Sequence, residues 1–169
     1  DYANSRIVKF GPLGGALDAW GVNGTGPQQL KRPYGIELDV SGNVYVAWSE
    51  YHAFAPTNAV LVSRSTNGGD SFSRPTRDTP QEHGTASFAD LAVGPDGTVY
   101  LTYVTYPSSS RPTADVWLLV STDGGVSFGA PIHVSSIELF DSNQFAGATG
   151  TVDCGDGPFA CESGFTFSR

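Results

Sequence analysis

The chain has 169 residues, a formal net charge of −8, 39% hydrophobic residues and 21 glycines. Such acidity disfavours nucleic acid and anionic membranes as partners, because their phosphates repel it, and no apolar run approaches the roughly 18 residues of a membrane helix. Many glycines, 11 prolines and 12% aromatic residues favour an all-β protein with many turns over a disordered chain.

The first 33 residues contain two short strand-like segments, residues 4–10 (NSRIVKF) and 16–21 (ALDAWG). We predict that they form the outer two strands of a four-stranded unit whose inner two strands are missing. A linker rich in Gly, Pro and Gln follows them. Region 1–33 is therefore interpreted as a partial unit plus a linker.

A duplicated unit follows. Residues 38–48 (LDVSGNVYVAW) recur at 92–103, and residues 60–72 recur at 116–128. The first pair is offset by 55 residues (97 − 42) and the second by 56 (121 − 65). Two segments with nearly the same offset, in the same order, indicate duplication of a whole module.

Each module is predicted to contain four strands, since runs such as VYLTYV and VWLLV are β-branched and aromatic and turn residues separate them. In the second module the predicted strands are 88–93, 98–106, 115–121 and 127–134. Four short strands repeated at this length are typical of a β-propeller blade. We therefore predict an all-β partial propeller of about three blades, the first and last incomplete. Its predicted regions are 1–33, 34–80, 81–136 and 137–169.

Two turn sequences carry a family resemblance. STNGGDSF (65–72) and STDGGVSF (121–128) resemble the Asp-box repeat (BNR repeat) of sialidase-type propellers. The matching positions are Ser121, Asp123, Gly125 and Phe128 in the second copy, and Ser65, Gly69 and Phe72 in the first, where Asn67 replaces the Asp. The resemblance implies outer hairpins remote from an active site. We interpret these residues as structural: the Asp binds turn amides, the Gly takes a positive φ and the aromatic residue packs below.

The N-terminal stretch is similar to a different repeat. Residues 1–48 contain NSRIVKF, KRPYGIELD and SGNVYVAW, which resemble the NHL repeat. That resemblance implies a propeller that binds proteins or RNA, or in a few cases an enzyme. The acidic charge argues against RNA.

A sialidase would need, as the resemblance implies, three arginines on the substrate carboxylate, a Tyr nucleophile assisted by Glu, and an Asp acid/base. The chain has seven arginines, none in the Arg-Ile-Pro motif that opens a sialidase domain. Three of them precede prolines on linkers. No catalytic set is visible in this segment, and whether the parent protein is an enzyme stays open.

Ligands of propellers bind where the inner strands and their loops line the mouth of a central channel. Glu37 and Asp39 alternate with apolar residues, and Asp90 lies in the equivalent strand of the second module. These three carboxylates are the candidate ligand-binding residues. The alternative is that they are solvated or cap turns.

Cys154 and Cys161 lie close together in CGDGPFAC. We predict a local disulfide, which implies an extracellular or periplasmic location; the alternative, a metal site, would need further ligands. The three histidines (His52, His83 and His133) are each alone in the sequence. No metal site and no cofactor are predicted.

The leading hypothesis is a secreted recognition or scaffold module that binds a glycan, a peptide or a protein. The alternative is a fragment of a sialidase-like exo-glycosidase. Neither nucleic acid nor membrane insertion is expected. An incomplete propeller exposes apolar blade faces, so self-association is also predicted. The chain is expected to begin after processing or to be a piece of something longer; the alternatives are that it is a fragment or that an assembly completes the ring.

Overall fold

The computed structural model describes residues 1, 3–24, 29–50, 58–77, 79, 85–106 and 113–138. This part of the chain is all-β: it contains strands and turns but no helix. Among these residues, none forms a helix long and apolar enough to cross a membrane. The main elements are two four-stranded antiparallel sheets.

Each four-stranded sheet is a meander, because its strands neighbour one another in chain order. Sheet 1 consists of β5 (Gly35–Leu38), β6 (Val44–Glu50), β7 (Ala59–Ser65) and β8 (Thr76–Arg77). Sheet 2 consists of β9 (Thr85–Val93), β10 (Val99–Tyr106), β11 (Thr113–Ser121) and β12 (Ile132–Glu138).

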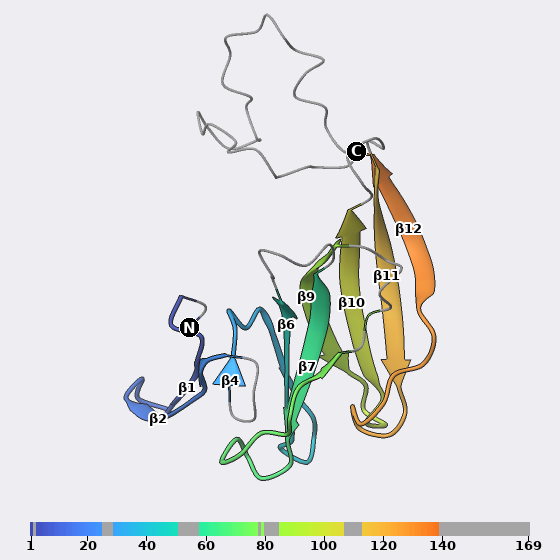
Figure 1. The fold of residues 1–169 in the computed structure, drawn as a ribbon. Coiled ribbons are helices and arrows are strands. Elements are labelled where there is room, and N and C mark those ends of the chain that lie inside the picture. Colours follow the sequence, from blue (N-terminus) through green and yellow to red (C-terminus); the bar gives the residue numbers. More distant parts are fainter. Residues whose placement is uncertain are drawn as a thin grey trace, which may run out of the picture.

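Two smaller strand pairs precede sheet 1. Strands β1 (Ile7–Phe10) and β2 (Ala16–Trp20) form an antiparallel hairpin. Strands β3 (Val22–Asn23) and β4 (Gln29–Leu30) pair in parallel. The hairpin, sheet 1 and sheet 2 follow one another across the molecule (Figure 1).

The sequence repeat corresponds to equivalent positions in the two sheets. In sheet 1, Val44 of the second strand pairs with Ser65 of the third, and in sheet 2 Val99 pairs with Ser121 in the same manner. The paired residues are 21 residues apart in sheet 1 (65 − 44) and 22 apart in sheet 2 (121 − 99), so the register between the second and third strands is the same in both sheets. The duplication therefore produces two sheets of the same design.

The sheets stack through apolar faces. The core between them contains Tyr45 and Ala47 of β6, and Leu101 and Tyr103 of β10, all at most 2% exposed. The opposite face of sheet 1 forms a second core, in which Val46 and Trp48 pack with residues from the N-terminal elements. Sheet 1 is thus covered on both faces, at least over its middle strands.

The first strand of sheet 1, β5, is less well covered on one face. Ile36 and Leu38 on β5 are 47% and 58% exposed, whereas Leu91, which occupies the position of Ile36 in sheet 2, is 6% exposed. Leu91 packs against sheet 1. No described strand lies over Ile36 and Leu38 in the same way, because the preceding hairpin supplies only β1 and β2.

Strand β12 differs from its predicted position, since it begins at Ile132 and not at Ser127. Ser127 is held in the preceding turn, where its amide and hydroxyl both bond to Asp123. Pro131 has no amide hydrogen for a sheet hydrogen bond. Regular pairing therefore starts after the proline.

Candidate functional site

The first strands of the two sheets approach closely. A Cβ atom on Gly35 of β5 would lie 3.1 Å from the carbonyl oxygen of Ala89 and 3.1 Å from Cα of Asp90 in β9. A side chain at this position would fit only if the neighbouring backbone moved by a few tenths of an ångström. Strands β5 and β9 are therefore in direct backbone contact at Gly35.

Three aromatic side chains meet near one end of β5 and β9. The ring of Phe88 in β9 lies 6.0 Å from that of Tyr34, which precedes β5, and 6.4 Å from that of Tyr106 at the end of β10. Both pairs are in edge-to-face arrangement, a favourable geometry for aromatic rings. We call Tyr34, Phe88 and Tyr106 the aromatic cluster. Burial raises the pKa of Tyr106.

The cluster includes a strained residue with an exposed side chain. Phe88 has a φ of 55°, in the left-handed region that bulky residues rarely adopt. It lies where the register between β9 and β10 shifts, and its side chain is 41% exposed. Strain of this kind costs about 1–3 kcal/mol and is concentrated at functional sites. Phe88 therefore combines a strained backbone with a ring that is only partly buried.

The three predicted ligand-binding carboxylates lie in different settings. Asp90 is exposed at the Gly35 contact, and its Oδ1 accepts a hydrogen bond from the amide of Leu91 at 3.0 Å. Glu37 is half-buried on the same side of β5 as Gly35, and its Oε1 accepts from the amide of Leu38 at 3.1 Å. The structure thus places Glu37 and Asp90 on the neighbouring inner strands, and their role in binding stays a prediction.

Asp39 is engaged in the β5–β6 turn. Its Oδ1 accepts from the amides of Ser41 and Asn43 at 2.8 and 2.9 Å, and its Oδ2 accepts from Asn43 Nδ2 and the Tyr45 hydroxyl. Burial alone would raise the pKa of Asp39, but these hydrogen bonds outweigh it and lower the pKa. For Tyr45, burial first and the nearby Asp39 charge second raise the pKa. These hydrogen bonds to the Asp39 carboxylate stabilise the β5–β6 turn.

The second polar turn, residues 121–128, is organised by one serine and one aspartate. Ser121 Oγ accepts from the amide of Gly125 and donates to Asp123 Oδ1, both at 2.8 Å. Asp123 also accepts from the amides of Val126 and Ser127 and from the Ser127 hydroxyl. The Ser127 side-chain bond is the main cause of a strongly lowered Asp123 pKa. Phe128 packs against the core between the sheets.

The first polar turn, residues 65–72, repeats most of these connections with an amide in place of the carboxylate; the Asp70 amide bonds instead to the Asn67 backbone carbonyl. Ser65 Oγ accepts from the amide of Gly69 and donates to Asn67 Oδ1. Asn67 Oδ1 accepts from the amide of Ser71, and its Nδ2 donates to the Ser71 hydroxyl. Phe72 is 7% exposed and packs near Trp20. The side-chain oxygen of Asn67 therefore accepts hydrogen bonds in this turn as that of Asp123 does in the second turn.

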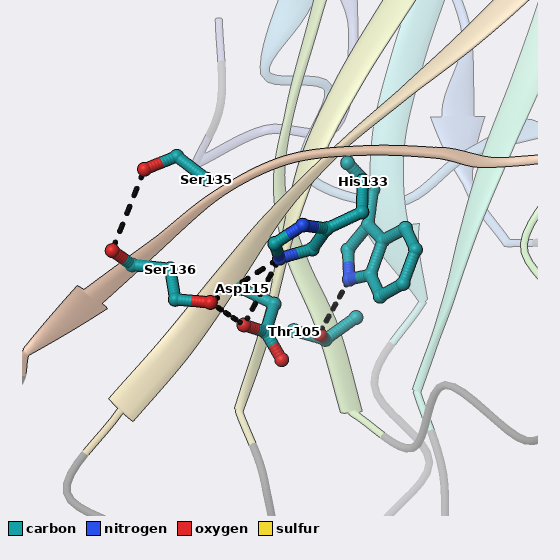
Figure 2. Close-up of polar contacts among 6 residues, drawn as sticks. Thr105, Asp115, His133, Ser135 and Ser136 are labelled. Carbon is teal, nitrogen blue, oxygen red and sulfur yellow. Dashed lines mark hydrogen bonds and ion pairs between the residues drawn. The ribbon is translucent and has the colours of Figure 1, made fainter.

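A further polar cluster joins β11 to β12 (Figure 2). Asp115 Oδ1 lies 3.3 Å from His133 Nε2 and accepts from the Ser136 hydroxyl at 2.6 Å, and that hydroxyl is 3.2 Å from the same His133 nitrogen. A nucleophilic triad uses both ring nitrogens of its histidine, one for serine and one for aspartate. Here both partners meet Nε2, so the cluster links strands and does not form a Ser-His-Asp relay.

Two described arginines are engaged in structural contacts. Arg6 Nε lies 2.8 Å from Asp1 Oδ2, and Arg64 Nη1 donates to the Gly124 carbonyl at 2.9 Å. Across the described ranges, no group of three or more His, Cys, Asp or Glu side chains is placed to hold a metal ion. Cys154, Cys161, His52 and His83 lie outside the described residues. The disulfide between Cys154 and Cys161 therefore stays a prediction.

The aromatic cluster was not found by sequence reasoning. Its members come from three separate segments: Phe88 and Tyr106 lie in strands β9 and β10, and Tyr34 directly precedes β5. The sequence contains one weak signal. Tyr34 directly precedes Gly35, and Phe88 directly precedes Ala89 and Asp90, so the two aromatic residues stand at similar places before β5 and within β9. Only the stacking of β5 on β9 brings the rings together.

Comparison with known proteins adds one finding. No family model matches the chain, and no curated protein matches it. The structure is similar to that of the protein described as Hadza microbial sialidase Hz136, with a TM-score of 0.50 and 18% sequence identity. The fold is sialidase-like. The similarity covers 60% of this chain and 25% of the other, so the chain spans about a quarter of that sialidase's length.

Proposed function

We propose that the two stacked sheets are consecutive blades of a β-propeller and that the chain is a recognition module for carbohydrate. The propeller proposal is supported by the repeated meander design, the face-to-face stacking of the sheets and the sialidase-like fold. The exposed inner-strand residues Ile36 and Leu38 also suit a ring in which a further sheet precedes sheet 1.

The observation that carries the binding proposal is the aromatic cluster. Tyr34 is 60% exposed and Phe88 is 41% exposed, and both stand beside the inner strands that carry Glu37 and Asp90. A pyranose ring presents one apolar face of C–H bonds and a rim of hydroxyls. Aromatic faces suit the former, and carboxylates accept hydrogen bonds from the latter. The site thus combines the two chemistries that a sugar requires.

The charge distribution favours a neutral sugar. The chain has a formal net charge of −8. The proposed site itself carries two carboxylates, those of Glu37 and Asp90. An anionic sugar would meet repulsion there unless arginines compensated for it. Arg6 and Arg64 are committed to Asp1 and to the Gly124 carbonyl. As part of the same proposal, the module acts outside the cell or in the periplasm, in keeping with the predicted disulfide.

The second candidate function is part of a sialidase-like glycoside hydrolase. The structural similarity to a sialidase supports it. Because the matched part is a quarter of that protein's length, the catalytic residues of such an enzyme would lie mostly in blades beyond this segment. A fold hosts many functions, so the similarity alone does not decide between binding and hydrolysis.

One experiment separates the two functions. The 169-residue protein is titrated by calorimetry with neutral oligosaccharides and with sialylated ones, and the longest form of the protein that its gene encodes is incubated with a fluorogenic sialoside. Binding of neutral sugars without release of the fluorophore supports the recognition module. Fluorophore release supports the glycosidase fragment and overturns the first proposal. Absence of binding to every sugar would also reject the first proposal.

A further inference from the structure

The first polar turn contains an asparagine followed by a glycine, a pair in which the side-chain amide is chemically labile. Asn67 and Gly68 are both exposed, and Gly68 has a φ of 69°. A Cβ atom at Gly68 would meet nothing within 4 Å. Solvent therefore reaches the peptide bond between the two residues, and Gly68 has no side chain to hinder the approach of its nitrogen to the Asn67 side chain.

The Gly68 nitrogen is not tied into the backbone of the turn. Among the contacts of the described residues, the Gly68 amide donates no hydrogen bond. The chain offers a comparison in Asn23, which is also exposed and precedes Gly24. There the Gly24 amide donates to the Leu30 carbonyl at 2.9 Å. Attack by the Gly24 nitrogen would require that bond to break, at a cost of about 0.5–1.5 kcal/mol, so Asn67 is expected to react faster.

The side-chain carbonyl of Asn67 is polarised by two hydrogen-bond donors. Its Oδ1 accepts from the Ser65 hydroxyl at 2.8 Å and from the Ser71 amide at 3.0 Å. Negative charge develops on this oxygen when a nitrogen or a water molecule adds to Cγ, and donors already aimed at the oxygen stabilise that charge. The Ser71 hydroxyl lies 2.9 Å from Nδ2. The turn thus holds groups against both the oxygen that gains charge and the nitrogen that leaves.

A carboxylate at position 67 would also find its hydrogen-bond donors in place. In the second polar turn, the donors to Asp123 include two serine hydroxyls and one serine amide. Ser65 and Ser71 supply the same three groups in the first turn. The Ser71 hydroxyl needs only to rotate so that it donates instead of accepting. These bonds become charge-assisted, and therefore stronger, when a carboxylate replaces the amide.

We propose that Asn67 is a site of spontaneous deamidation in the folded protein and that aspartate is the product that the turn favours. The Gly68 nitrogen bonds to Asn67 Cγ, the Cγ–Nδ2 bond breaks, and ammonia leaves with the proton of the Gly68 amide. Water then adds to Cγ of the resulting succinimide ring. The bond from Cγ to the Gly68 nitrogen breaks, a proton returns to that nitrogen, and a carboxylic acid is left that ionises.

The reaction consumes one water molecule and releases one ammonia molecule, and no electrons are transferred. It gives the first polar turn the carboxylate that the second turn already has. Because the reaction needs no enzyme and is not reversed by water, the modified fraction rises with the age of the protein. The proposal does not depend on carbohydrate binding.

Peptide mapping by mass spectrometry tests the proposal on the full 169-residue protein, which is incubated in mildly alkaline buffer. We expect Asn67 to lose its amide at least about tenfold faster than Asn23. The free peptide STNGGDSF, incubated in parallel, gives the product ratio without the fold, since water opens a succinimide to aspartate or to isoaspartate. The protein is expected to give at least about twice the peptide's ratio of aspartate to isoaspartate, because the donors to Oδ1 favour attack at Cγ.

Two variants assign the signal and the product. N67Q is expected to remove the conversion, since glutamine would have to close a larger ring, and the matched control N23Q is expected to leave it unchanged. N67D supplies the authentic product, and its peptide is expected to elute with the modified peptide of the unmodified chain. N67D is also expected to be at least as stable to urea at neutral pH as the unmodified protein.

Four results would each overturn the proposal, and the first three need no variant to fold. They are equal rates of amide loss at Asn67 and Asn23, conversion of Asn67 only in urea-unfolded protein, and a product ratio equal to that of the free peptide. The fourth is unfolding of N67D at a lower urea concentration than the unmodified protein at neutral pH, because the turn would then not accept a carboxylate.

Discussion

Arg64 of sheet 1 donates a hydrogen bond from Nη1 to the backbone carbonyl of Gly124 in sheet 2, at 2.9 Å. This contact ties the second polar turn to the neighbouring sheet. Gly125 of the same turn lies over Tyr45, since a Cβ there would be 3.1 Å from that ring. Polar and apolar contacts thus join the two sheets at the outer hairpin as well as in the core.

Replacement of Arg64 by alanine is predicted to weaken the stacking of the two sheets. Loss of a partly buried, charge-assisted hydrogen bond is expected to cost about 1–2 kcal/mol of unfolding free energy. Urea unfolding measures the change. R77A, on the exposed edge strand β8, serves as the matched control, and an equal loss in both variants would contradict the prediction.

Replacement of Gly35 by alanine is predicted to separate β5 from β9. The added Cβ would meet only backbone atoms, with Leu91 N at 3.3 Å in addition to the contacts with Ala89 and Asp90. Overpacking of this kind costs about 1–3 kcal/mol. Thermal and urea unfolding check the loss. G15A is the control, because a Cβ at Gly15 meets nothing within 4 Å; comparable stability of G35A and G15A would refute the predicted close contact.

Replacement of Ser121 by alanine is predicted to destabilise the second polar turn. Ser121 is 1% exposed, and its loss leaves the amide of Gly125 without its hydroxyl acceptor. An unsatisfied buried donor costs about 1–3 kcal/mol. Denaturant unfolding of S121A is compared with that of T122A, whose exposed side chain is expected to matter by less than about 0.5 kcal/mol. A stable S121A would show that the turn does not need this hydroxyl.

Stability is predicted to fall in acid because of Asp123 and Asp39. Hydrogen bonds, led for Asp123 by that of Ser127, lower both pKa values below the ordinary 3.8. A lowered folded-state pKa means that the unfolded chain binds protons first, so the stabilisation is complete above about pH 4 and is lost as the pH falls further. Unfolding free energies between pH 7 and about pH 2.5 measure the slope.

The variant D123N isolates the contribution of Asp123 to that slope. Asn67 performs the equivalent role in the first polar turn, so D123N is expected to fold. Its stability should fall less steeply below about pH 4, because the titrating group is gone. An unchanged acid slope would show that Asp123 does not contribute.

Replacement of Phe88 by asparagine is predicted to weaken sugar binding while preserving the fold. Asparagine tolerates a positive φ better than phenylalanine does, so the substitution relieves backbone strain. This relief offsets part of the stability lost with the ring contacts. The free energy of unfolding should therefore change by no more than about 1 kcal/mol. Affinity for the neutral oligosaccharide should fall at least about tenfold, as calorimetry would record. F10N, at a 62% exposed position of β1, is the control; equal affinity in F88N and F10N would exclude the aromatic cluster as the binding site.

The sequence by itself determined the local design of the sheets. The repeat of about 55 residues, the alternation of β-branched and aromatic residues and the glycine-rich turns predicted two meanders of four strands, and the structure contains them. These features depend on neighbours along the chain, so sequence spacing is sufficient to find them. The start of β12 was missed because Asp123 captures Ser127 through side-chain bonds that strand propensity does not include.

Tertiary structure decided the location of the candidate site. The predicted carboxylates were separated by the fold, with Asp39 committed to its own turn and Glu37 and Asp90 placed on neighbouring inner strands. The aromatic cluster depends on rings from three segments that meet only when β5 packs on β9. Contacts between residues far apart in sequence are set by how whole sheets stack, and no local pattern encodes that relationship.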